Sequence, residues 1–169
     1  MRHVVTLLGA KSAGKTSLCL QWSGSLPSSS YVMTMNVQPY FFPLMVIYDT
    51  PSDERFNKDI ESLYEKTDVF ILICREDGYY SDIYTNIIRK WPKKRWLLIL
   101  NGDQPFRQRR RWALCYDIRV LNINISTGYG LNEAMDYLLE MLPEIDHRQV
   151  GVDLESVGSL LDVLYSSCV

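Results

Sequence analysis

The sequence predicts an α/β fold with a central, mostly parallel six-stranded sheet. Apolar runs of strand length alternate with segments in which apolar residues recur at helical spacing. The runs are continuously apolar, which is typical of strands covered by helices on both faces. At 169 residues and 47% hydrophobic content, the chain is most simply one domain with a sizeable core. The expected strands are His3–Leu8, Val32–Val37, Leu44–Tyr48, Val69–Cys74, Trp96–Leu100 and Arg119–Ile125.

Helices are expected between these strands. They are Lys15–Ser23, a segment beginning near Glu54, Ser81–Trp91, a short basic one at Gln108–Leu114, and Leu131–Leu142, which Pro143 stops. We divide the chain into a domain over residues 1–143 and an acidic C-terminal extension over residues 144–169. Within the extension, Asp153–Tyr165 predicts a short amphipathic helix. That helix would fold back onto the domain or dock onto a partner.

The motif G-x-x-x-x-G-K-T occupies Gly9–Thr16, after an apolar run and before a helical segment. In this context it is a specific signal for phosphate binding, because glycines let successive backbone N–H groups form an anion nest at a helix N-terminus. Lys15 would reach the β- and γ-phosphates, and the Thr16 hydroxyl could bind Mg²⁺. A vestigial loop is the alternative. The expected phosphate-binding residues are Gly9, Lys11, Ser12, Ala13, Gly14, Lys15, Thr16 and Ser17.

A second polar element follows the run Leu44–Tyr48. Asp49 ends this strand, where a carboxylate can hold Mg²⁺ directly or through water. From Asp49 the chain reads D-T-P-S-D-E-R-F, which resembles the D-T-A-G-Q-E-R-F segment of Rab-type small GTPases, and the glycine motif is similar to the same family's opening. The resemblance covers about Val4 to Leu142. It implies a three-layer P-loop NTPase fold with six strands and five helices, and GTP or GDP with Mg²⁺ as cofactors.

The resemblance also implies a first switch threonine. Thr34-Met35-Asn36-Val37 looks like the family's T-I-G-V and begins 19 positions after Lys15. The metal ligands would then be Thr16, Thr34 and Asp49. The distance from Thr34 to Asp49 is several residues shorter than the family leads us to expect, and we place the shortening in a hairpin at Gln38–Pro43. Ser28 is a less favoured alternative, and a surface threonine without a role is a third interpretation.

The segment expected to be catalytic departs from the family pattern. Ser52 stands where the family has a glycine whose N–H meets the γ-phosphate, and Pro51 restricts the backbone before it. Asp53 aligns with the glutamine that orients the attacking water, and its negative charge would repel the charge it should help stabilise. Lys11 stands where bulk tends to obstruct a partner's arginine. We therefore expect hydrolysis of GTP to be slow or absent.

Base recognition is expected to be degenerate. Where the family has N-K-x-D, the chain has Asn101, then Gly102 in place of the lysine, then Asp103 one position early. The family's S-A-K appears as Ser126-Thr127-Gly128, again without the lysine. The resemblance implies that Asn101, Asp103, Ser126 and Thr127 face the base. Guanine is the expected base, with weaker selectivity or affinity than usual.

Charge is unevenly distributed along the chain. Nine basic residues and one acid lie between Arg89 and Arg111, whereas from Asn132 to the end eight acids face Arg148 alone. Such runs usually form a solvated surface. The more specific interpretation is a surface that binds anionic lipid or a charged partner. We expect effector or regulatory proteins as partners at the switch loops, and no nucleic acid.

Location is predicted from the two ends of the chain and its thiols. Met1-Arg2-His3 leads directly into a strand, which leaves no room for a signal peptide, and the four cysteines show no metal spacing. We therefore expect a cytoplasmic protein with reduced, mostly buried thiols. Cys168 is not in a C-a-a-X box, so membrane association would be at most peripheral.

The leading hypothesis is an atypical Rab- or Ras-like switch in intracellular traffic or signalling. The alternative is a pseudo-GTPase, a protein-interaction subunit without a nucleotide cycle. A small P-loop kinase is a third and weak hypothesis, supported only by the basic run Arg107–Arg111.

Overall fold

The computed structural model describes residues 2–25, 33–52, 60–75, 82–102, 113 and 116–144, and the structural statements below concern those residues. They form an α/β fold with ten elements. The strands are β1 (His3–Leu8), β2 (Gln38–Phe41), β3 (Met45–Asp49), β4 (Val69–Arg75), β5 (Arg95–Asn101) and β6 (Arg119–Ile123). The helices are α1 (Lys15–Trp22), α2 (Ile60–Lys66), α3 (Asp82–Lys90) and α5 (Leu131–Met141).

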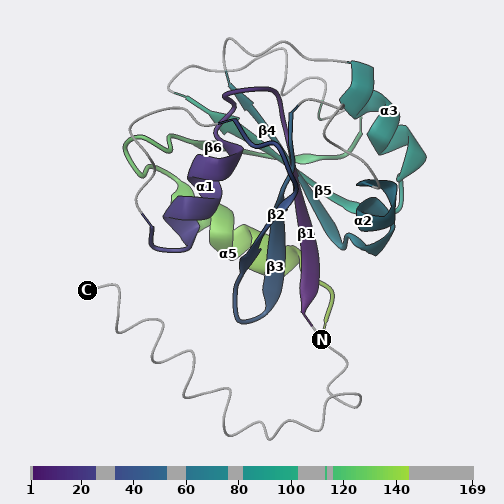
Figure 1. Cartoon of the computed structure of the whole chain (residues 1–169), viewed down its shortest axis with the longest axis horizontal. Coiled ribbons are helices and arrows are strands. Elements are labelled where there is room, and N and C mark those ends of the chain that lie inside the picture. The colour runs from purple at the N-terminus through teal and green to yellow at the C-terminus, as the bar shows by residue number, and fades with distance from the viewer. Residues whose placement is uncertain are drawn as a thin grey trace, which may run out of the picture.

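All six strands belong to one sheet, in the order β2-β3-β1-β4-β5-β6. Every neighbouring pair is parallel except β2 and β3, which form an antiparallel hairpin at one edge. In Figure 1, α1 and α5 lie on one side of the sheet, and α2 and α3 lie on the other. The predicted α/β class and the mostly parallel six-stranded sheet are therefore confirmed.

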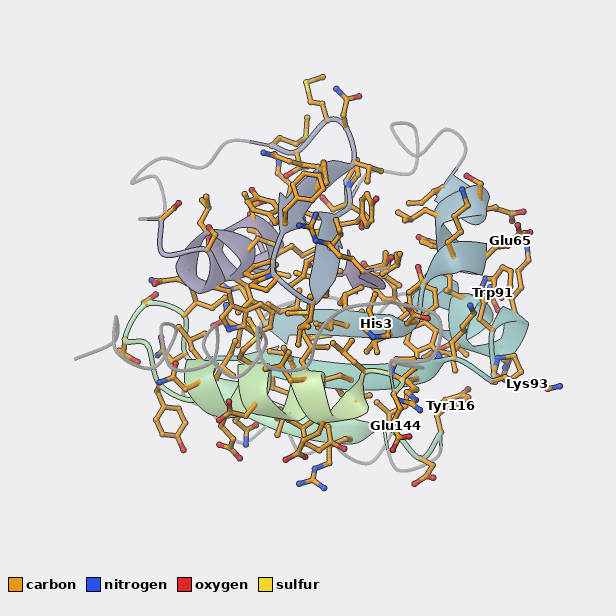
Figure 2. The ribbon with its side chains drawn as sticks, turned by 90° about the horizontal axis from the view of Figure 1, so that it is seen from below. His3, Glu65, Trp91, Lys93, Tyr116 and Glu144 are labelled. Atoms are coloured by element: carbon orange, nitrogen blue, oxygen red, sulfur yellow. The ribbon has the colours of Figure 1, made fainter. Side chains whose placement is uncertain are left out.

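The central strands divide their side chains between the two faces. Phe70, Leu72 and Leu98 point to the α2–α3 face, where Tyr64 of α2 and Ile88 of α3 cover them. Phe70 stacks on Trp96 with ring centroids 4.4 Å apart. Trp91 and Tyr116, both labelled in Figure 2, pack at the margin of this cluster. This face is therefore the more aromatic of the two.

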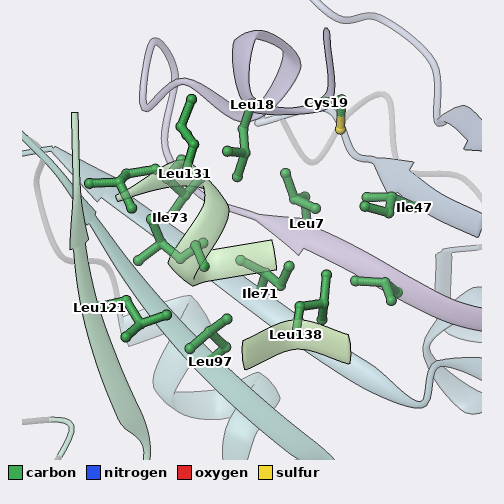
Figure 3. Close-up of a cluster of buried hydrophobic side chains, with 14 of the residues drawn as sticks. Leu7, Leu18, Cys19, Ile47, Ile71, Ile73, Leu97, Leu121, Leu131 and Leu138 are labelled. Atoms are coloured by element: carbon green, nitrogen blue, oxygen red, sulfur yellow. The ribbon is translucent and has the colours of Figure 1, made fainter. Parts of the chain in front are cut away.

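The opposite face carries the intervening strand residues, drawn in Figure 3. Leu7, Ile71 and Leu97 pack there against Leu18 of α1 and Leu138 of α5. Since successive side chains of a strand point to opposite faces, a strand covered on both sides must be apolar at every position. This is the physical reason for the unbroken apolar runs that predicted the sheet.

The second strand was predicted in the wrong place. The described part of Val32–Val37, residues 33–37, is not a strand, and β2 is Gln38–Phe41 instead. Phe41 pairs with Val46 and Gln38 with Asp49, so β2 and β3 form a short hairpin whose turn comprises residues 42–44. An edge strand has one neighbour and a solvent-facing side, and even Pro39 is tolerated there. Apolar content therefore did not locate this strand.

The other predicted elements are confirmed to within a few residues where the structure describes them. The residues before Ile60 in the second helix lie outside the described residues. So do Gln108–Leu114 except Ala113, and all of Asp153–Tyr165, so the division into residues 1–143 and 144–169 stays a prediction. Cys19 and Cys74 are buried and form no disulfide, as predicted, while Cys115 and Cys168 are outside the described part. Among the described helices, none has the length and apolar character needed to cross a bilayer.

Candidate functional site

The candidate site lies at the carboxyl ends of the parallel strands. Lys15 and Thr16 open α1 just after β1, Asp49 ends β3, and Asn101 ends β5. Ligands of open α/β sheets bind at this edge, because the loops that leave it present backbone N–H groups and helix N-termini. The sequence predicted all four residues as binding residues, and the fold brings them to one edge of the sheet.

The glycine loop has a shape that side chains would prevent. A Cβ added to Gly9 would lie 2.4 Å from the carbonyl oxygen of Ile73, well inside contact distance. Gly14 has φ of +105°, and a Cβ there would lie 2.7 Å from Ile125 Cδ1 and 2.8 Å from Asn101 Nδ2. The loop is therefore pressed against β4, β5 and the segment after β6, and both glycines are required for that approach.

Other loop residues predicted to bind phosphate differ in their accessibility. Lys11 and Ser12 are exposed, and Ser12 has φ of +59°, an uncommon conformation for a residue with a side chain. Ser17 is half-buried in the first turn of α1. The methyl group of Ala13 belongs to the hydrophobic cluster, so only the backbone of this residue can meet a ligand.

Lys15 is held inside the loop and is only 6% exposed. Its ammonium group donates to the backbone oxygens of Gly9, at 2.7 Å, and Ala10, at 3.2 Å. Burial lowers the pKa of Lys15, and the nearby charge of Asp49 opposes that shift. The ammonium group is thus oriented by neutral carbonyls, and an anion entering the loop would stabilise its charge.

Three side-chain oxygens converge beside this lysine. The Thr16 hydroxyl donates to Asp49 Oδ2 at 2.5 Å, and the Thr34 hydroxyl donates to the same oxygen at 3.3 Å. The two hydroxyl oxygens are 3.0 Å apart. Residues from α1, from the segment before β2 and from the end of β3 therefore meet at one point. These are the three residues predicted as metal ligands.

The carboxylate of Asp49 is incompletely satisfied. The residue is fully buried, and among the described residues its Oδ1 has no hydrogen-bond partner. Burial raises the pKa of Asp49, against the lowering effects of the Thr16 hydrogen bond, the Lys15 charge and the Thr34 hydrogen bond. A buried oxygen without a partner is costly, and it marks a position where a cation could bind.

The donor set suits a hard divalent cation. One carboxylate and two hydroxyls are oxygen ligands of the kind that Mg²⁺ takes together with waters and phosphate oxygens. Clusters of three or more His, Cys, Asp or Glu side chains are absent from the described part of the chain, so a zinc-type centre finds no support there. Thr16, Thr34 and Asp49 therefore fit the predicted magnesium site.

The negative charge of Asp49 also affects two neighbouring groups. Burial raises the pKa of Tyr40 to about 12, and Cys19 and Asp49 add to the shift. The pKa of the Cys19 thiol is raised well above its usual value by burial and by Asp49, with Lys15 opposing. Both groups therefore stay neutral at physiological pH, and neither compensates Asp49.

A pocket of about 370 Å³ opens beside the three oxygens. It is lined by Thr16 and by residues 33–39, and the side chains of Met33 and Met35 on its rim are 37% and 52% exposed. This volume lies within the usual range for small-molecule sites. A ligand there would touch the segment that carries Thr34, the predicted first switch threonine.

On the side of the site predicted to hold the base, polar groups already form hydrogen bonds within the protein. Asn101 donates through Nδ2 to the backbone oxygen of Ala13 at 3.1 Å and accepts through Oδ1 from the backbone N–H of Ile125 at 3.1 Å. The N–H groups of Ser126 and Thr127 both donate to Asn124 Oδ1, at 2.9 and 3.1 Å. Asn101 therefore joins the end of β5 to the glycine loop and to the segment after β6. The backbone N–H groups of Ser126 and Thr127 point into their own loop.

Two structural residues of the site were not predicted. Asn124 organises the loop after β6, and the only signal for it was an Asn two residues before a Ser-Thr-Gly turn. Thr50 is buried and donates to the backbone oxygen of Leu7 at 2.6 Å, which ties the chain after Asp49 to β1.

The segment expected to be catalytic is described only at its start. Pro51 is buried and Ser52 is half-buried immediately after it. Asp53, at the expected glutamine position, lies outside the described residues, as does Asp103 from the expected base motif. Their predicted roles therefore rest on the sequence.

Comparison of the chain with protein-family models found no match, and comparison with curated proteins also found none. The resemblance to Rab-type GTPases therefore rests on the motifs quoted above and on their order in the chain.

Proposed function

We propose that this chain is a guanine-nucleotide-binding molecular switch of the Rab/Ras type, with weak or impaired hydrolysis of GTP. One observation carries the proposal: the oxygens of Thr16, Thr34 and Asp49 meet around a buried carboxylate, next to a glycine-shaped loop that contains a buried lysine. A phosphate chain and a hard cation are the ligands that this combination suits.

Each residue would have a distinct task. The backbone N–H groups of the loop and the Lys15 ammonium group would bind the phosphates, and Thr16, Thr34 and Asp49 would hold Mg²⁺. The bound cation would neutralise phosphate charge. Thr34 lies on the segment between α1 and β2, so the occupant of the site would bias the arrangement of that segment. A partner protein that contacts residues 33–39 would then distinguish the ligand states.

Slow hydrolysis follows from the residues around the expected water position. Ser52 follows a proline, and Asp53 would place a carboxylate close to the γ-phosphate, where it opposes the build-up of negative charge. Even a complete site of this type hydrolyses GTP at only about 10⁻⁴ per second without a partner's arginine. The switch would therefore depend on exchange of nucleotide or on a partner.

Identification of the nucleotide that co-purifies with the protein tests the proposal. After gentle purification in Mg²⁺, denaturation should release GDP or GTP. Lys15→Ala should release little or none, whereas the exposed Lys66→Ala on α2 should release as much as the wild-type protein. If the wild-type protein releases no nucleotide and binds none when GTP, GDP or ATP is added with Mg²⁺, the proposal fails.

The pseudo-GTPase stays the second candidate because of one observation on the base side. Asn101 and the amides of Ser126 and Thr127 already have partners within the protein. A chain with this arrangement could keep the fold as an interaction surface while losing nucleotide affinity. Failure of all nucleotides to bind, in a protein that is folded by circular dichroism, would favour this candidate.

A further inference from the structure

A basic surface with an aromatic centre lies at the end of the molecule where β5 begins. It comprises Arg89, Lys90, Trp91, Lys93, Lys94 and Arg95, and we call it the basic corner. All five cations are exposed or half-buried, and Figure 2 shows Lys93 extending away from the ribbon. The carboxyl ends of the strands, where the candidate nucleotide site lies, form the opposite edge of the sheet.

Within the described part of the chain, the positive charge of the basic corner is only partly compensated. Lys90 forms an ion pair with Glu61 of α2. Lys94 donates instead to a backbone oxygen, that of Glu65, at 2.7 Å, and Arg95 donates to the backbone oxygen of Met141. These carbonyls orient the cations without neutralising them. An anionic ligand would therefore be attracted to this surface.

Trp91 gives the basic corner an apolar component. Its ring is half-buried, and the ammonium groups of Lys90 and Lys94 lie 5.9 and 6.0 Å from the ring centroid. An indole ring with two cations beside it suits a ligand that offers apolar side chains together with carboxylates. An acidic amphipathic helix has this composition.

The chain itself contains an acidic amphipathic segment, which begins beside the basic corner. The hydrogen bond from Arg95 to Met141 fixes the C-terminal end of α5 against the basic corner. Glu144, where the described part of the chain ends, is labelled in Figure 2 on the same side of the molecule as Trp91, Lys93 and Tyr116. The next 25 residues, 145–169, contain four acids and one arginine, with Leu154, Val157, Leu161 and Leu164 at helical spacing.

The connection is long enough for this segment to return. Residues 145–152 precede the predicted helix, and eight extended residues reach at most about 28 Å. The predicted helix, Asp153–Tyr165, would be about 20 Å long. The basic corner adjoins the end of α5, from which the segment leaves, and therefore lies within that reach.

We propose that the acidic segment 145–169 docks in cis onto the basic corner. Its apolar stripe covers Trp91, and Asp153, Glu155 and Asp162 approach the cations that form no ion pair with the described residues. The opposite charges and the exit of the chain beside Arg95 favour this occupant over an anionic membrane, which the acidic segment would repel. The proposal does not depend on nucleotide binding.

Zero-length carbodiimide cross-linking of the full chain tests this proposal. The reagent joins lysines to carboxylates that touch, and peptide mass spectrometry identifies the pairs. At low salt we expect links from Lys90, Lys93 or Lys94 to acids of the segment 145–169, and their loss near 1 M salt, where the Debye length is about 3 Å. Cross-linking a mixture of ¹⁵N-labelled and unlabelled protein separates links within one chain from links between two copies.

A charge swap makes the test specific. The double variant Arg89→Glu/Lys93→Glu should lose most of the links, and so should Asp153→Lys/Glu155→Lys. Combining all four changes should restore linking, now between residue 93 and the new lysines. Arg2→Glu, a charge reversal outside the basic corner, should change nothing. The named variants leave the ion pair of Lys90 and the hydrogen bonds of Lys94 and Arg95 in place.

Three outcomes would overturn the proposal. One is the absence of links at low salt in the folded wild-type protein. Another is links found only between labelled and unlabelled chains, which would indicate a second copy as the occupant. The third is binding of the wild-type protein to vesicles rich in phosphatidylserine that depends on Arg89 and Lys93, because a docked acidic segment would block that surface.

Discussion

The two halves of the candidate site differ in how far the protein satisfies its own polar groups. On the phosphate side, Asp49 Oδ1 is buried without a partner among the described residues, and the buried ammonium group of Lys15 faces neutral carbonyls. On the base side, Asn101, Ser126 and Thr127 all have protein partners. Binding energy is gained where polar groups are unsatisfied before the ligand arrives. For the proposed nucleotide site, this difference predicts strong recognition of phosphate and cation and weak recognition of the base.

The largest expected effect comes from Lys15. Lys15→Ala removes the only cationic side chain buried in the glycine loop, and a hydrogen bond to a charged group contributes about 1.5–3 kcal/mol. Nucleotide affinity should therefore fall by roughly 10- to 150-fold. Titration with a fluorescent GTP analogue measures it, with Lys66→Ala as the matched control. Equal affinities in the two variants would exclude Lys15 from the phosphate site.

Asp49→Asn should weaken binding and stabilise the empty protein. Mutation of residues that only support metal ligands typically lowers metal affinity or activity about 10- to 100-fold, and loss of a carboxylate ligand should cost at least as much. The loss should appear as a higher Mg²⁺ concentration needed for nucleotide binding. Asparagine can still accept the hydrogen bonds from Thr16 and Thr34. Since burial raises the pKa of Asp49, its ionised form lowers the free energy of unfolding at neutral pH.

The pH dependence of this effect has a definite sign. The unfolded carboxyl titrates near 3.8 and the folded one at a higher pH. The stability advantage of Asp49→Asn should therefore be full above the folded pKa and shrink as pH falls toward 3.8. Urea unfolding without ligand at pH 7.5 and pH 5 measures it, with the exposed Asp136→Asn as control. A wild-type protein more stable than Asp49→Asn at pH 7.5 would contradict the burial argument.

Gly14→Ala should destabilise the loop without removing any functional group. The new methyl group would contact Ile125 and Asn101 at less than 3 Å, at φ of +105°. A strained residue of this kind costs about 1–3 kcal/mol. Gly24→Ala, at φ of +74° with no atom within 4 Å of the added carbon, separates the conformational cost from the steric one. Thermal unfolding should show the larger loss for Gly14→Ala, and equal losses would mean that the close packing is unimportant.

The smallest expected effect is on the choice of base. With the amides of Ser126 and Thr127 held by Asn124, GTP and ATP should differ in affinity by less than the 10⁴-fold of sites built to hydrogen-bond their substrate. Competition of GTP, ATP and tripolyphosphate against the fluorescent analogue measures the difference. A preference for GTP of 10⁴-fold or more would show that Asp103 or a rearranged loop recognises guanine.

Prediction succeeded best where the physical signal is local. Glycine spacing and a following helix identified the loop of Gly9–Thr16, and mainly apolar runs of strand length identified the five parallel strands, although β6 alternates polar and apolar residues. It failed for β2, because an edge strand that pairs on one side carries little apolar signal. The role of Asn124 was missed because its side-chain oxygen, Oδ1, accepts hydrogen bonds from backbone N–H groups only two and three residues away. Many turns share this pattern, so it does not single out a residue.

The sequence by itself determined the α/β class, the glycine loop, and the residue types available for phosphate and cation. Only the tertiary structure decided that Thr16, Thr34 and Asp49 share one point, while one carboxylate oxygen has no partner within the described part of the chain. It also decided that Asn101 joins the loop to the segment after β6. Residue types and spacing follow from the local chain. Hydrogen-bond partners depend on which distant segments the sheet brings together, and no local stretch of the sequence specifies that pairing.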